Sequence, residues 1–149
     1  MEGYHHTQES PLCVLFFRTA VVLLVGALFT LDKYPAALIL GGGGALAVFL
    51  WMAFYDFAIE DQGAFLAIRF GLLPLFRRKV QYTDIEKAEV GRTMILDGWG
   101  IHYRVGGGWV WNLWGRACVV IHFKNGSVLR IGTDDAEKLS EFLERKRVT

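Results

Sequence analysis

The chain has 149 residues, enough for one domain of ordinary size plus a short additional region, and 53% of them are hydrophobic. Its formal net charge of +1 provides no basic field of the kind that holds nucleic acid, so no nucleic-acid partner is expected. Cys13 and Cys118 stand too far apart to form a C-x-x-C pair, and two cysteines are too few for a disulfide framework.

The hydrophobic residues are concentrated in the first third of the chain. Residues 12–31 and 36–55 are two long apolar runs, and the first contains a single charge, Arg18. About 20 residues of helix cross ~30 Å of hydrocarbon, so each run predicts a transmembrane helix. A cleavable signal peptide is disfavoured because the leader has no Lys or Arg. We therefore expect an N-terminal tail (1–11), a two-helix transmembrane hairpin (12–55) and a separate domain (56–149).

The basic residues predict the orientation of this helical hairpin. Arg69, Arg77, Arg78 and Lys79 follow the second run closely, whereas the turn between the runs contains one basic residue, Lys33. By the positive-inside rule, the tail and the C-terminal domain both face the cytoplasm. The expected location is therefore the inner (cytoplasmic) membrane.

Two features inside the predicted membrane helices are candidate contact sites. Arg18 lies about 9 Å deep at helical rise, where its side chain can snorkel to the headgroups or pair with an acidic residue of a partner helix. A glycine run that includes Gly41, Gly43 and Gly44 provides faces with small residues at four-residue spacing. These faces are expected to contact the chain's own first helix near Gly26, or else a foreign helix or a lipid or pigment tail.

From residue 55 onward, apolar residues recur with period two between turn residues, which predicts antiparallel strands. The predicted strands cover residues 55–60, 64–70, 76–82, 85–92, 99–105, 117–123 and 127–132. Near the C-terminus the pattern changes, because acids at 134–137 and bases at 145–147 flank an apolar stripe that includes Leu139 and Phe142. This pattern predicts an amphipathic helix that covers the sheet.

Seven strands followed by one amphipathic helix resemble the pleckstrin-homology (PH) fold. The stretches FGLLPLFRRKVQYTDIEKAEV, GIHYRVGGGWVW and VVIHFKNGSVLRIGTDDAEKLSEFL resemble bacterial PH-like domains that follow two membrane helices. The resemblance implies a membrane α-hairpin plus an α+β or all-β domain, built as a seven-stranded bent sheet or barrel capped by one C-terminal helix. Phosphoinositide-binding members carry Lys and Arg around their first β-hairpin. Because that loop is Asp61-Gln62-Gly63 here, inositol phosphate binding is not implied.

The sequence contains no P-loop, no G-x-S-x-G and no H-E-x-x-H motif, so we expect neither enzymatic activity nor a bound cofactor or metal. His5, His6 and Glu9 have the spacing of ligands on one helical face, but such residues in a tail are usually solvated. His102 and His122 lie in predicted strands, where an ordinary hydrogen-bonded histidine is expected.

Outside the membrane, the candidate contacts for a partner or a lipid are Arg77, Arg78, Lys79, Trp109, Trp111 and Trp114. The three basic residues follow an apolar loop, and each charge near an anionic surface contributes about 1 kcal/mol. Their alternative role is the solvated end of a strand pair. The tryptophans have the composition of an interface centre, although each is equally compatible with the core of the domain.

These observations favour binding over chemistry. The expected function is that of a non-catalytic membrane-anchored adaptor, an accessory subunit that stabilises a larger complex of integral membrane proteins. A photosynthetic, respiratory, transport or secretion complex is equally compatible as the host. The alternative function is a PH-like module that binds or senses anionic membrane lipids.

Overall fold

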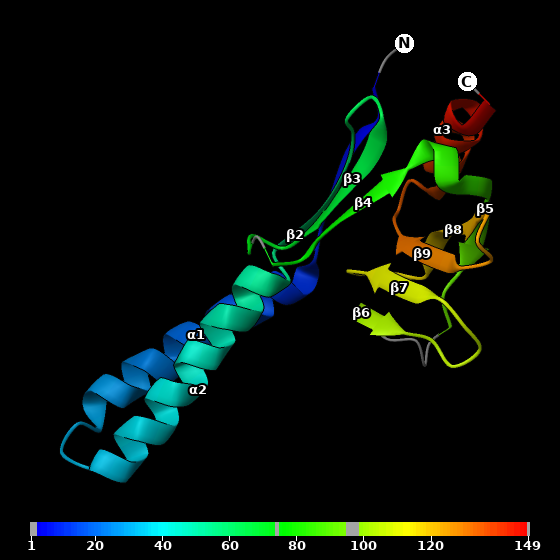
Figure 1. Ribbon diagram of the computed structural model, residues 1–149. Coiled ribbons are helices and arrows are strands. Elements are labelled where there is room, and N and C mark those ends of the chain that lie inside the picture. The colour runs from blue at the N-terminus through cyan, green and yellow to red at the C-terminus, as the bar shows by residue number, and fades with distance from the viewer. Residues whose placement is uncertain (1–2, 74, 95–98, 149) are drawn as a thin grey trace.

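The computed structural model describes residues 3–73, 75–94 and 99–148, and it begins with a strand and a helical hairpin (Figure 1). Helices α1 (Pro11–Phe29) and α2 (Tyr34–Ala53) pack against each other along their length. Both are long and apolar enough to cross a membrane, and only 11% and 17% of their most apolar windows are buried. The two predicted apolar helices are therefore confirmed, and most of their apolar surface is exposed.

The strands of the described residues form two sheets. The first sheet has the order β1 (His5–Glu9), β2 (Asp56–Asp61), β3 (Phe65–Phe70) and β4 (Arg77–Gln81), all antiparallel. A short 3₁₀ turn, η1 (Tyr82–Asp84), leads into the second sheet. Its order is β5 (Ile85–Arg92), β8 (Ala117–Phe123), β9 (Val128–Gly132), β7 (Trp109–Asn112) and β6 (Gly100–Tyr103). Within it, β7 and β9 are parallel neighbours.

This arrangement corrects two expectations. The described residues form nine strands in two separate sheets rather than seven strands in one bent sheet or barrel, and no closed barrel is present among them. The two additional strands are β7 and β1. Strand β1 comes from the leader that was expected to be a solvated tail, and it pairs with β2 from Glu9↔Asp56 to His5↔Glu60.

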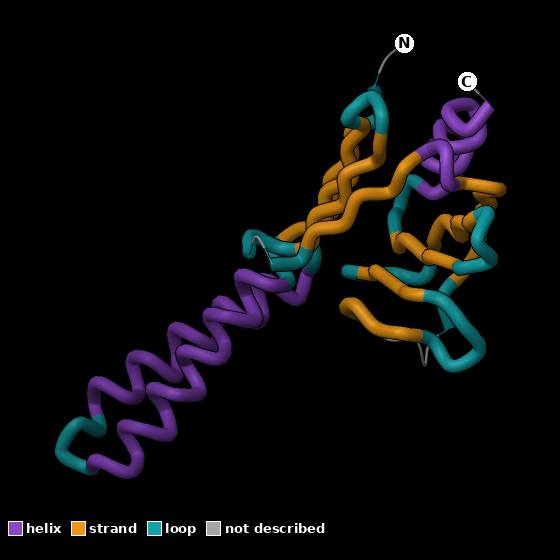
Figure 2. The backbone as a smooth tube through the Cα atoms, viewed as in Figure 1, coloured by secondary structure: helices purple, strands orange, loops and turns teal. Residues whose placement is uncertain are grey.

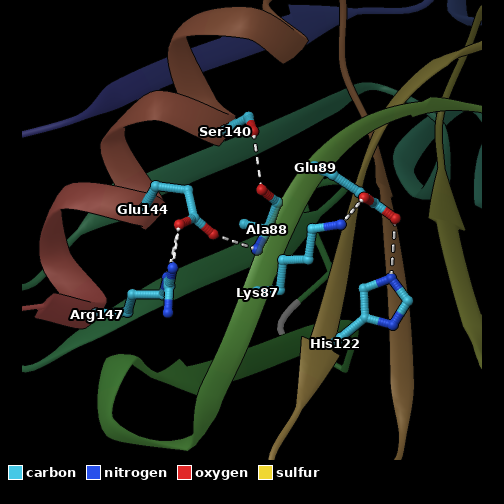
Figure 3. Close-up of polar contacts among 7 residues, drawn as sticks. All are labelled: Lys87, Ala88, Glu89, His122, Ser140, Glu144 and Arg147. Atoms are coloured by element: carbon cyan, nitrogen blue, oxygen red, sulfur yellow. Dashed lines mark hydrogen bonds and ion pairs between the residues drawn. The ribbon is translucent and has the colours of Figure 1, made fainter.

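The inner faces of the two sheets enclose the core, and the C-terminal helix α3 (Ala136–Val148) closes it at one end. Leu139 and Leu143 are fully buried and Phe142 is 5% exposed, so the predicted apolar stripe of this helix does cover the sheet. Figure 3 shows Ser140 and Glu144 of α3 directed at Ala88 of β5, so the helix also covers the free edge of that strand.

The β-domain is attached to the helical hairpin at several points. Strand β1 directly precedes α1 and lies beside β2, which directly follows α2, so the leader and the domain are at the same end of the helices (Figures 1 and 2). The loop after β3 returns to α2, where the N–H of Leu72 donates to the carbonyl of Met52 at 2.9 Å. Gly71 permits this approach, because a Cβ there would lie 2.3 Å from the carbonyl oxygen of Ala53.

Candidate functional site

Two stretches that are distant in the sequence line one groove of about 460 Å³. One wall is formed by residues 75–78, at the start of β4, and the other by Ile101 of β6 with Trp109 and Trp111 of β7. The basic cluster and the tryptophan cluster were predicted separately as contact sites. The structure brings members of both clusters together.

The groove lies at the end of the core nearer the helical hairpin. Helix α3 closes the opposite end, and Figure 1 shows it at the far side of the domain from α1 and α2. At the near end, the loop after β3 bonds to the end of α2, and an added Cβ on Gly100 would lie 3.9 Å from the ring of Phe54. The start of β4 and the start of β6 are therefore both close to the point where α2 meets the domain.

Arg78 is the charged residue on the inner side of this groove. In β4 it pairs with Ile68, and Val80 pairs with Leu66, so the strand alternation places Arg78 on the face that otherwise forms the core. Its side chain is half-buried, and this burial lowers the pKa of the Arg78 guanidinium. Within the part of the chain that the structure describes, Arg78 has no hydrogen-bond or ion-pair partner.

The three consecutive basic residues do not all reach the groove, because Lys79 is absent from its lining. Arg77 and Lys79 lie on the outer face of the first sheet because side chains alternate along a strand. The ammonium of Lys79 lies 4.8 Å from the ring centroid of Phe65, a cation–π contact on that outer face. Arg77 and Arg78 border both the groove and a second hollow of about 380 Å³, which Lys79 also lines.

Arg69, on the same outer face, has a structural role. Its guanidinium donates to both carboxylate oxygens of Asp56, at 3.1 and 2.7 Å, and to the carbonyl of Gly71 at 3.0 Å. Asp56 is the first residue of β2, and only two residues separate it from the end of α2. This bidentate pair therefore fixes the loop after β3 against the junction with the helices.

The tryptophans occupy three different environments. Trp109 is 44% exposed and its ring contacts the edge of Tyr103, with 5.7 Å between centroids. Trp111 is 7% exposed and belongs to the core, and its indole N–H finds no acceptor among the described residues. Trp114 is outside the groove and stacks on Trp99 at 4.4 Å. Only the first two tryptophans of the predicted cluster therefore reach the groove.

Within the helical hairpin, the glycine run packs mainly on its own partner helix. An added Cβ on Gly44 would lie 2.7 Å from Leu24, and one on Gly43 would lie 3.3 Å from Leu23. The contact at Gly41 is looser, at 4.0 Å from Ala27. The first of the predicted alternatives, contact with the chain's own first helix, thus describes Gly43 and Gly44.

Arg18 is exposed on the surface of α1. Its neighbour Phe17 contacts Trp51 near the end of α2, with 5.8 Å between ring centroids. Trp51 in turn makes an edge contact with Tyr55, so aromatic rings gather at the level of Arg18. Arg18 therefore lies on the exposed surface of α1 beside a cluster of aromatic rings.

The histidines of the leader, which was expected to be a solvated tail, lie on opposite faces of β1 because a strand alternates its side chains. His5 is 3.3 Å from the carboxylate of Glu60, and His6 is 2.5 Å from that of Asp134. His122 is 3.2 Å from Glu89 (Figure 3). These three imidazoles thus each contact a carboxylate that is distant in the sequence, whereas Nε2 of His102 is buried and has no hydrogen-bond partner among the described residues.

Sequence reasoning missed Ile101 and Phe76 as neighbours of the basic residues, since nothing in their local patterns distinguishes them from core positions. The groove exists because the two sheets diverge at this end, which is a property of the tertiary arrangement. No family model and no curated protein matches the sequence.

Proposed function

We propose that this chain is a non-catalytic membrane-anchored adaptor, an accessory subunit that binds a larger complex of membrane proteins. The helical hairpin crosses the inner membrane, and the domain, together with the leader, lies on the cytoplasmic side. The domain is PH-like, with two facing sheets and a C-terminal helix. The large lipid-facing surface of α1 and α2 and the placement of β1 beside β2 support this topology.

The observation that carries the adaptor role is the exposed aromatic and apolar tip of the β6–β7 hairpin. Tyr103 is 63% exposed, Val105 is fully exposed, and Trp109 contacts Tyr103 from the facing strand. Single exposed apolar residues are normal, but a projecting cluster of aromatic and branched side chains is typical of a protein interface.

The charge of this hairpin indicates the kind of partner surface. Residues 99–116 include Arg104 and Arg116 but no Asp or Glu. Aromatic residues together with arginine are the composition enriched at interface centres. The complementary surface is therefore an apolar patch with acidic residues at its rim.

The attachment of the domain determines where such a partner lies. Two residues separate α2 from β2, one residue separates β1 from α1, and the Arg69–Asp56 pair fixes the loop after β3. With no flexible linker, the β6–β7 hairpin stays at a set height above the bilayer. The partner surface is accordingly the membrane-proximal part of another integral membrane protein.

A photo-reactive amino acid placed at Tyr103 of the full-length chain in native membranes tests this proposal. We expect it to crosslink a membrane protein, whereas the same group at Lys124, in the exposed turn between β8 and β9, does not. The double variant Tyr103→Ser, Val105→Ser should keep its melting temperature and lose copurification of that protein. Unchanged copurification, or equal crosslinking from Lys124, would contradict the adaptor role at this surface.

A further inference from the structure

We propose that the groove between β4 and β7 binds the anionic headgroup of a membrane phospholipid, with the Arg78 guanidinium on the phosphate. This site rests on the membrane topology proposed above and shares Trp109 with the adaptor surface, but its basic residues belong to β4. It adds a specific lipid contact to a chain that is otherwise anchored by hydrophobic helices.

The first reason is the state of Arg78. A guanidinium placed among apolar side chains loses hydration, and proteins normally compensate with a carboxylate or other acceptor. Arg78 faces Ile101, Trp109 and Trp111 across the groove and has no partner among the described residues. The lowered pKa of Arg78 has the same origin as this lost hydration, since burial is its cause. An anion in the groove would supply the missing acceptor.

The second reason is charge complementarity. The residues that line the groove include Arg77 and Arg78 and no Asp or Glu. Arginine binds phosphate through two parallel N–H···O bonds, a geometry that the compact ammonium of lysine lacks. The two free oxygens of a phosphodiester can therefore accept two parallel hydrogen bonds from one guanidinium in this groove, a pair that a lysine side chain could not donate.

The third reason is the position of the groove relative to the hairpin. Leu75, which lines the groove, is 76% exposed, and Leu72 beside it is held to the last turn of α2. Trp51 and Tyr55 at that same end have the placement of an interfacial aromatic belt, the level at which phospholipid phosphates lie. The exposed leucines extend into the outer acyl region, and the groove beside them receives the headgroup.

The apolar side chains that line the groove match the part of a phospholipid next to its phosphate, namely the glycerol backbone and first acyl carbons. A free phosphate would not cover the ring of Trp109, which is 44% exposed, or the half-buried Phe76, whereas the glycerol backbone and first acyl carbons of a lipid would. An anionic lipid thus matches both the basic wall and the aromatic wall.

Lys79 provides a matched control for this site. It lies one residue from Arg78 on the same strand and carries the same charge, but it projects from the outer face toward Phe65. Diffuse attraction to an anionic bilayer depends on total charge, so it would be weakened equally by Arg78→Gln and Lys79→Gln. A groove site is weakened only by the first.

The experiment is native mass spectrometry of the full-length protein released from vesicles of phosphatidylcholine containing a minor fraction of phosphatidylglycerol. We expect the unaltered chain and Lys79→Gln to retain phosphatidylglycerol, and Arg78→Gln to bind it about tenfold more weakly, the loss of one charge-assisted bidentate contact. Equal retention by Arg78→Gln and Lys79→Gln, or equal retention of phosphatidylcholine, overturns the proposal.

Two further arms complete the test. If thermal unfolding without anionic lipid shows that Arg78→Gln is destabilised, Arg78→Lys replaces it as the test variant. Arg78→Lys must also lose phosphatidylglycerol, because lysine keeps the charge but lacks the planar guanidinium. Millimolar inorganic phosphate must fail to displace the lipid, since displacement would mean a simple anion site. If Arg78→Gln leaves lipid binding intact but abolishes the Tyr103 crosslink, the groove belongs to a protein partner and the lipid site is overturned.

Discussion

The carboxylate of Glu144 in α3 accepts a hydrogen bond of 2.6 Å from the backbone N–H of Ala88 in β5. One turn earlier in the helix, the hydroxyl of Ser140 donates to the carbonyl of the same residue at 3.2 Å. Both polar groups of Ala88 that face away from β8 are thereby satisfied by side chains (Figure 3). The helix therefore protects an exposed strand edge and is itself fixed in orientation.

This contact predicts a pH dependence of stability. Burial alone would raise the pKa of Glu144, but the hydrogen bond from Ala88 and the nearby Arg147 lower it overall. A folded-state pKa below the unfolded value contributes stability at neutral pH that is lost as the pH falls through the folded pKa. Glu144→Gln should therefore cost about 1 kcal/mol at neutral pH and make the melting temperature less sensitive to acid. Thermal unfolding of the full-length protein in detergent, with Glu141→Gln as the exposed control, measures both effects.

The core position of α3 predicts a large effect of Phe142→Ala. The ring is 5% exposed and packs on Tyr4 of the leader and Tyr82 of η1, with 5.5 and 6.2 Å between centroids. Truncation of a buried aromatic ring leaves a cavity and should cost about 3 to 5 kcal/mol. Chemical unfolding in detergent measures this loss against Glu141→Ala. A difference below about 1 kcal/mol would mean that the helix is not packed as described.

The glycine run predicts opposite results for two neighbouring substitutions. A methyl group at Gly44 would meet Leu24 at 2.7 Å and force the helices apart, whereas nothing lies within 4 Å of a methyl group at Gly42. Gly44→Ala should destabilise the helical hairpin by about 1 to 3 kcal/mol, the usual cost of overpacking. Gly42→Ala should be neutral or slightly stabilising. Melting temperatures of the two variants in the same detergent decide this, and equal values would show that the run does not mediate the helix contact.

Cysteine labelling tests the orientation in the membrane. In a Cys13→Ser, Cys118→Ala background, a cysteine at Lys33 in the helical turn should react with a membrane-impermeant reagent added to intact cells. A cysteine at Lys138, which is exposed on α3, should react only after the cells are opened. The reverse pattern would place the domain outside, and protection at both sites would argue against a hairpin that crosses the membrane.

The leader illustrates what local pattern does not reveal. His5–Glu9 has no apolar alternation, yet it forms β1 because β2 offers an unpaired edge within reach of the start of α1. Further contacts reinforce the strand, including a hydrogen bond from the Gln8 side chain to the carbonyl of Trp114 at 3.3 Å. An edge strand of this kind is stabilised by ladder hydrogen bonds to a distant segment, and these leave no period in the sequence.

The two apolar helices, the strands of both sheets other than β1 and β7, and the amphipathic α3 follow from the sequence itself. Each depends on a repeat of apolar residues whose period the backbone geometry dictates, and the helix ends fall within about two residues of the apolar runs. The candidate site, in contrast, could not be predicted from local sequence patterns. Arg78 and Trp109 are separated by thirty residues and acquire a common environment only because the sheets close under α3 and diverge beside α2. Which strand faces which, and where a core is left open, depends on the packing of whole sheets, and no local pattern contains that information.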